Sequence, residues 1–141
     1  MSKVNLVLFK TMLDNVVKQK QMADMSFAVT KQILNTLYKL NEANRNKFRL
    51  FDENEQNEHM EVINKETKNI ISMIGKVCID FQKIDKLVDN FNVDFNDVDH
   101  PNYLEKQETF NKILLATNAL VKNQQKASSS LSKYYKAILS L

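Results

Sequence analysis

Glycine and proline are almost absent from this chain, which has 141 residues but only one of each, Gly75 and Pro101. These two residue types mark most tight changes of chain direction. The chain is instead rich in lysine, asparagine, leucine, glutamate and glutamine. The sequence therefore predicts an all-α protein made of a few long helices.

Long apolar runs and cysteine pairs are absent as well. The apolar run at residues 6–9 is shorter than the core of a signal peptide, which needs about 7–15 apolar residues. No stretch approaches the roughly 18–20 apolar residues of a membrane span. The single cysteine, Cys78, has no partner for an internal disulfide, in agreement with a reducing compartment. We therefore expect a cytoplasmic protein with one domain, residues 1–141.

Residue types that carry catalysis or bind metal ions are few. The two histidines, His59 and His100, fit no metal-binding motif. Cys78 has no histidine near it on its helix face, so we expect a buried structural thiol. One glycine is too few for a phosphate-binding loop, and the lysines are not interleaved with aromatic residues as in nucleic-acid-binding proteins. We therefore expect no enzyme activity, no metal, no cofactor and no small-molecule substrate.

Apolar residues recur at alternating steps of three and four along three segments, residues 6–51, 60–91 and 103–141. This spacing is typical of helices that pack side by side. Further apolar residues flank each row, which favours a bundle over a two-stranded coiled coil. We expect helices over about 3–51, 54–91 and 102–140. Short connections between them predict an elongated up-down-up three-helix bundle with coiled-coil-like heptad seams.

The helix boundaries have chemical signals of their own. Asp52 and Glu55 form a pair that resembles a capping box, and Pro101 suits the first position of a helix. Three asparagines between residues 41 and 46 lower the helix propensity there. The first helix therefore either reaches residue 51 or ends after residue 41.

Polar residues interrupt the apolar rows at matching heights of the expected bundle. Aligning the three helices at their turns places Asn41, Thr67 and Gln124 in one layer. Buried polar side chains need partners, and a polar layer can fix the register of a bundle. The same alignment places Lys20 near Lys106, with ammonium groups that reach water or acidic residues such as Asp85.

The first helix is expected to extend beyond the second. At 1.5 Å per residue the first helix would be about 70 Å long and the second about 55 Å long. Roughly the first 15 residues of the first helix would then have no part of the second helix beside them. Large exposed apolar patches usually mark interfaces. The cover is either the connection at residues 91–103 or another polypeptide, including a second copy. We predict a partner-binding site there, formed by Leu6, Phe9, Met12 and Leu13.

These patterns lead to three alternative functions. The first is a non-enzymatic helical adaptor or complex subunit that acts through protein–protein contacts and self-associates or binds a partner. The second is a peripheral membrane-binding module, because residues 110–141 contain five lysines and no acidic residue. The third is a chaperone or cargo-binding bundle. The residues expected to face an anionic surface are Lys122, Lys126, Lys133 and Lys136.

Methionine also belongs among the expected core residues. Five methionines occur at helical positions, and thioether side chains fill irregular gaps in cores. Met22 and Met25 fit an exposed face as well. We expect the group to fill the core rather than to form a binding surface.

Overall fold

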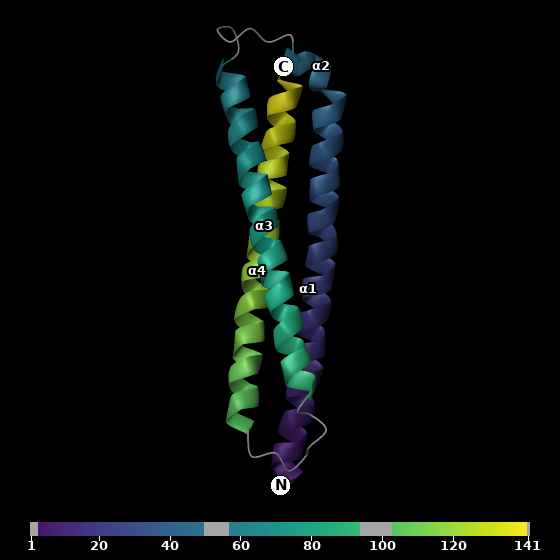
Figure 1. The fold of residues 1–141 in the computed structure, drawn as a ribbon, viewed down its shortest axis with the longest axis vertical. Helices are drawn as coiled ribbons and strands as arrows, with labels where there is room; N and C mark the ends of the chain where they lie inside the picture. The colour runs from purple at the N-terminus through teal and green to yellow at the C-terminus, as the bar shows by residue number, and fades with distance from the viewer. Residues whose placement is uncertain (1–2, 50–56, 94–102, 141) are drawn as a thin grey trace.

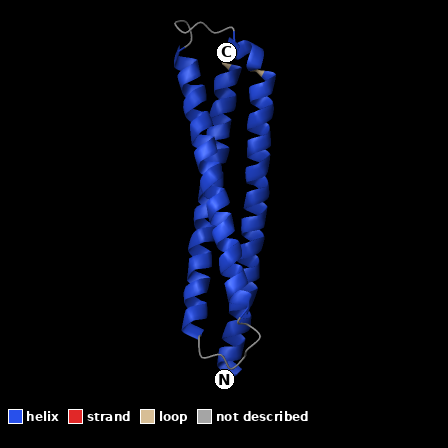
Figure 2. Cartoon of the chain, in the orientation of Figure 1, coloured by secondary structure: helices blue, strands red, loops and turns tan. Residues whose placement is uncertain are grey.

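A computed structural model describes residues 3–49, 57–93 and 103–140 of the chain. These residues form four helices and, within the described ranges, no strand (Figure 2). The prediction of an all-α protein is therefore confirmed. The helices are α1 (Lys3–Ala43), α2 (Arg45–Arg49), α3 (Asn57–Val93) and α4 (Tyr103–Leu139).

The three long helices lie side by side along the long axis of the molecule (Figure 1). In that view the chain runs upward in α1, downward in α3 and upward again in α4, so α1 and α4 are parallel. The short helix α2 lies at the upper end. The α3–α4 interface is the most extensive, and α1 packs on both of these helices.

The predicted first helix is interrupted at Asn44. The side-chain amide of Asn44 donates to the Leu40 carbonyl at 2.8 Å, and the backbone amide of Asn44 donates to the same oxygen at 3.1 Å. Asparagine side chains compete in this way with regular backbone bonding. Helix α1 ends at Ala43, and the expected boundary residues Asp52, Glu55 and Pro101 lie outside the described residues.

The deeply buried residues recur every seven positions along each long helix. A seven-residue step is nearly two helical turns, so each set forms one row that faces the other helices. The side chains in these rows are at most 7% exposed. The rows are Phe9, Val16, Ala23, Thr30 and Leu37; Ile63, Ile70, Val77, Ile84 and Phe91; and Lys106, Ile113, Leu120, Ala127 and Tyr134.

The second buried row of α1 differs by one residue from the predicted row. Alternating steps of three and four from Leu6 reach Leu13 and Leu34, so the sequence predicts that these two residues face the core, with Ile33 as a flanking residue. Instead Ile33 is 5% exposed and Leu34 is 40% exposed, while Ser26 is buried. Adjacent apolar pairs such as Ile33 and Leu34 fit either row, so the apolar pattern does not fix the rotation of α1 about its axis.

The predicted layer of Asn41, Thr67 and Gln124 does not form. The Ser26 hydroxyl lies 3.2 Å from Gln124 Oε1, and Ser26 precedes Asn41 by 15 residues, about 22 Å along the helix. Asn41 instead accepts a hydrogen bond from the Tyr134 hydroxyl. The alignment of α4 with its neighbours is therefore wrong in the sequence-based prediction.

The cause of this error is the hydrogen bonding of the threonines in the rows that face the other helices. The Thr67 hydroxyl donates to the Ile63 carbonyl of its own helix at 2.8 Å. Thr30 and Thr117 do the same with Ser26 and Ile113, also at 2.8 Å. Because these hydroxyls are satisfied within one helix, they require no partner across the bundle and carry no information about register.

The two seam lysines occupy different surroundings. Lys20 contacts Asp85, as predicted, and also pairs with Asp24 at 2.9 Å. Lys106 is buried, and its ammonium group donates to the carbonyls of Asn90 and Phe91 at 3.2 and 3.1 Å. Lys106 therefore pairs with carbonyls of the last turn of α3, which lack partners within that helix.

Candidate partner-binding surfaces

The predicted partner-binding residues near the N-terminus are largely covered by the chain itself. Phe9 and Met12 are each 7% exposed. Met12 belongs to a core cluster that includes Phe91 of α3, and Leu13 packs against the same cluster. The side chain of Leu6 lies outside the described residues. Of the two covers that the sequence left open, the one from within the chain is therefore present at Met12, which shares a cluster with Phe91. Partner binding by Leu6, Phe9, Met12 and Leu13 stays a prediction.

Helix lengths determine how far the N-terminal part of α1 extends beyond the end of α3 (Figure 1). The overhang was derived from a first helix that continues to residue 51. Because α1 ends at Ala43, it has 41 residues against 37 in α3, so the two helices differ by only about 6 Å in length. Phe91 near the end of α3 consequently reaches the level of Met12 and Val16.

The structure shows a different surface, the space between α1 and α4, where two hollows lie. We call this surface the α1–α4 groove. The lower hollow is lined by Met22, Met25, Ser26, Ala28, Val29, Val121 and Gln124. The upper hollow is lined by Thr36, Leu40, Leu131, Ser132, Tyr135 and Lys136.

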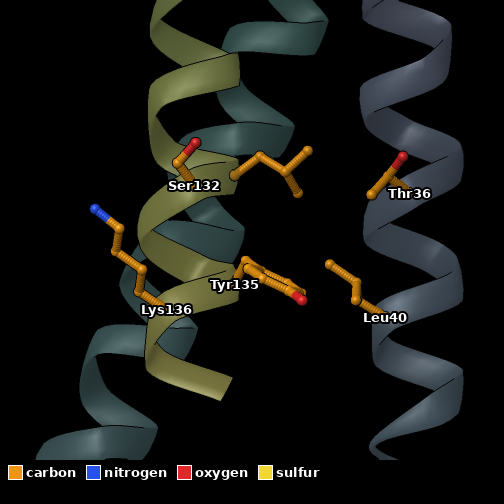
Figure 3. Close-up of a pocket in the computed structure, with 6 residues that line it drawn as sticks. Thr36, Leu40, Ser132, Tyr135 and Lys136 are labelled. Carbon is orange, nitrogen blue, oxygen red and sulfur yellow. The ribbon is translucent and has the colours of Figure 1, made fainter. Parts of the chain in front are cut away.

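The two hollows lie along one edge of the molecule. Met22, Val29 and Thr36 succeed one another at seven-residue intervals, so they share one face of α1. Val121 and Tyr135 are 14 residues apart, about four turns, and share one face of α4. Figure 3 shows the upper hollow, where Tyr135 and Leu40 point toward one another across the space between the helices.

The lining of the groove is apolar and nearly uncharged. Met25 is 71% exposed, and Met22, Val29 and Tyr135 are also exposed apolar residues. Lys136 is the charged residue among those that line the two hollows, and in Figure 3 its side chain points away from the space between the helices. Depletion of charge with enrichment of methionine and tyrosine is typical of the centre of protein interfaces.

Polar contacts join the two helices at the lower hollow, where Ser26 and Gln124 belong to its lining. The Ser26 hydroxyl bonds to Gln124 Oε1 at 3.2 Å, and Gln124 Nε2 donates to the Ser128 hydroxyl at 3.0 Å. These bonds hold Gln124 in one position, so the groove has a defined floor between the exposed apolar side chains.

A second surface runs along the outer side of α4. Lys122, Lys126, Lys133 and Lys136 are all exposed, as predicted for an anionic-surface site. Their spacing of four, seven and three residues places them on one face of the helix. Because residues 110–141 contain no acidic residue, no carboxylate of α4 beyond that point offsets this row. Binding of these lysines to an anionic surface stays a prediction.

Two ionisable groups between the helices have shifted pKa values. Burial raises the pKa of Tyr134 to about 12, because the charged phenolate is disfavoured away from water. Burial acts to lower the pKa of Lys20, but hydrogen bonds and Coulomb attraction from Asp85 and Asp24 outweigh it, so the pKa is raised. Both groups belong to contacts between helices and neither lies in the α1–α4 groove.

Cys78 is partly buried rather than fully buried as expected. Among the described residues, no group of three or more histidine, cysteine, aspartate or glutamate side chains is placed to hold a metal ion. No helix in the described part of the chain is long and apolar enough to cross a membrane.

The sequence indicated that Met22 and Met25 fit an exposed face, but it assigned the methionines to the core and did not predict a groove. Met22, Met25 and Val29 are apolar and lie at helical spacing, so they resemble core residues. The distinguishing signal is their position beside the buried row, since Ala23 and Thr30 follow Met22 and Val29 directly. Comparisons of this chain with protein-family models, with curated proteins and with solved structures find no match.

Proposed function

We propose that this chain is a non-enzymatic, cytoplasmic helical adaptor or complex subunit that binds a protein partner through the α1–α4 groove. Its framework in this proposal is the up-down-up three-helix bundle with coiled-coil-like heptad seams. The observation that carries the proposal is the row of exposed apolar side chains, led by Met25, along a groove whose two hollows have one charged lining residue, Lys136. Exposed contiguous apolar surface is costly in water unless it is covered by a partner.

A photo-crosslinking experiment tests this proposal. A photoreactive amino acid replaces Met25 in the groove or, as a matched control, Ile79 on α3, because the two side chains are 71% and 67% exposed. In cells of the native source we expect a discrete protein adduct at position 25 and none at position 79. The adduct should disappear when Val29→Asp introduces a charge into the groove. Equal adducts at both positions, or none at either, would exclude the groove as the interaction surface.

Binding to an anionic membrane surface is the second candidate. It is favoured by the exposed lysine row of α4, which faces away from the core and is not offset by acids within residues 110–141. Juxtaposed lysines of this kind each contribute about 1 kcal/mol on anionic lipid. Co-sedimentation with vesicles that contain phosphatidylserine, compared with phosphatidylcholine alone, tests it. Replacement of Lys122, Lys126, Lys133 and Lys136 by glutamine should abolish any binding that depends on this row.

The chaperone or cargo-binding alternative differs from an adaptor in specificity rather than in the surface used. A cargo-binding groove accepts many amphipathic helices, whereas an adaptor selects one partner. Several unrelated protein adducts at position 25, in place of one, would favour the cargo-binding alternative.

A further inference from the structure

We infer that the α1–α4 groove binds one amphipathic helix whose apolar stripe is flanked by aspartate or glutamate, so that partner and chain complete a four-helix arrangement. This inference rests on the proposed function and specifies the chemistry of the partner. Three properties of the groove support it: its length, its apolar centre and the sign of the charges along its edges.

The length of the groove matches a helix. From Met22 to Leu40 it extends over 18 residues of α1, about 27 Å, which is the length of a partner helix of about 18 residues. The two hollows lie along this line between parallel helices. A helix that lies in such a groove inserts apolar side chains that are three, four and seven residues apart. One group of these side chains would fill the lower hollow and the next group the upper hollow.

The edges of the groove carry lysines. On α1, Lys18 lies four residues before Met22 and Lys39 lies three residues after Thr36, which places both near the same face. On α4, Lys136 lines the upper hollow, and Lys122 lies 14 residues, about four turns, before it. All four of these lysines are exposed.

Few carboxylates offset these lysines: Asp14 lies four residues before Lys18, Glu42 lies three residues after Lys39 and 3.9 Å from Arg45, and residues 110–141 contain no acidic residue. Between residues 15 and 41, α1 contains one acidic residue, Asp24, which pairs with Lys20 at 2.9 Å. Lys20 also contacts Asp85, so this pair lies on the side of α1 that faces α3 rather than along the groove. The edges are therefore positive on both sides of an uncharged centre, which is complementary to an apolar stripe with acidic flanks.

A second copy of this chain is a poorer occupant. In a symmetric dimer the same surface meets itself, so a face-to-face pair would bring the lysine edges of one groove against those of the other. Like charges placed opposite each other oppose association. The charge pattern therefore favours a different polypeptide over self-association through this groove.

Designed peptides test the inference. One peptide of about 18 residues has a leucine stripe flanked by glutamates, a second has the same stripe flanked by lysines, and a third has glutamates with the stripe scrambled. Fluorescence anisotropy measures the Kd of each for the full chain. We expect the glutamate-flanked peptide to bind at least about tenfold more tightly than either other peptide, with an affinity that falls as salt is added.

Two sets of variants distinguish attraction by the lysines at the groove edges from attraction by the overall positive charge of the chain. Replacement of Lys18, Lys39, Lys122 and Lys136 by glutamine should reduce the affinity for the glutamate-flanked peptide at least about tenfold. A matched set on α3 removes the same charge away from the groove and should change affinity little. This control replaces Lys65, Lys76, Lys83 and Lys86, which are also exposed, by glutamine. A thermal melt of each variant confirms that it is folded.

Four outcomes would overturn the inference. Equal binding of the glutamate-flanked and lysine-flanked peptides would show that charge does not select the partner, while leaving the groove as an interaction surface. Equal effects of the two lysine sets would show that the attraction is general. Absence of binding by every peptide would exclude helix docking. A dimer in light scattering that Val29→Asp converts to a monomer would identify a second copy as the occupant.

Discussion

The Tyr134 hydroxyl of α4 donates a hydrogen bond to Asn41 Oδ1 of α1, close to the point where α1 ends. Tyr134 is fully buried, so this bond ties two parallel helices together from within the core. The lower contact between Ser26 and Gln124 does the same about 22 Å away along α1. Together the two bonds fix how α1 is aligned with α4, and so they fix the shape of the groove between them.

Tyr134 makes stability sensitive to alkaline pH. Its pKa is about 12 in the folded protein and about 10 in an unfolded chain. Between these values the unfolded chain binds fewer protons, so stability falls as pH rises, by up to about 1.4 kcal/mol per pH unit. Urea melts between pH 8 and about pH 11.5 should show that Tyr134→Phe loses this component. Tyr135→Phe, at an exposed neighbour, should keep it, and identical slopes in all three proteins would contradict this account.

Lys106 should stabilise the end of α3. It is 5% exposed and donates to the carbonyls of Asn90 and Phe91. Lys106→Met keeps most of the packing but leaves these carbonyls without the ammonium group, which should cost about 1–3 kcal/mol. Chemical denaturation compares it with Lys112→Met, an exposed lysine of the same helix that should change stability by less than about 0.5 kcal/mol. Equal stability of the two variants would show that the buried contacts contribute nothing.

Glu66 should destabilise the folded chain. It is 6% exposed, and its Oε2 atom is buried without a hydrogen-bond partner in the described part of the structure. Burial of a polar group without compensation costs about 1–3 kcal/mol in proteins. Glu66→Met, which has a similar shape, should therefore raise the free energy of unfolding. The control Glu61→Met changes an exposed glutamate of α3 and should have little effect. A less stable Glu66→Met protein would reveal a favourable contact of this carboxylate.

The sequence predicts the buried row of α3 well and that of α1 less well. On α3, Ile63, Ile70 and Val77 are buried at the predicted spacing. On α1, the adjacent apolar residues Ile33 and Leu34 fit two rows that differ by one residue. Which of them is buried depends on contacts with α4, and this information lies in another segment of the chain.

The candidate site was harder to predict than the fold. The length of the overhang depends on where the first helix ends, and the sequence left two ends open, residue 41 and residue 51; the structure places the end at Ala43. The groove required the alignment of α1 with α4, and Gln124 was assigned to the wrong layer. By contrast, the exposure of Lys122 and Lys126 follows directly from helical spacing, because charged residues opposite a buried row face water.

A double-mutant cycle tests the alignment of α1 with α4. Because Ser26 and Gln124 are hydrogen-bonded, Ser26→Ala and Gln124→Ala should show a coupling energy of about 0.5–1.5 kcal/mol. Asn41→Ala and Gln124→Ala concern residues about 22 Å apart along the bundle, so their effects on unfolding should add within about 0.5 kcal/mol. Coupling between Asn41 and Gln124, with additive effects of Ser26 and Gln124, would instead support the layer that the sequence predicts.

The methionine methyl groups provide the most direct measurement of the central claim, that the α1–α4 groove is the partner-binding surface. Met22 and Met25 line the groove, whereas Met12 is buried near the other end of α1 and Met60 and Met73 lie on α3. Methyl NMR spectra are recorded while the glutamate-flanked peptide is added to saturation. We predict that the resonances of Met22 and Met25 shift while those of Met60 and Met73 stay in place. Shifts at Met60 and Met73 with unchanged groove resonances would contradict the account.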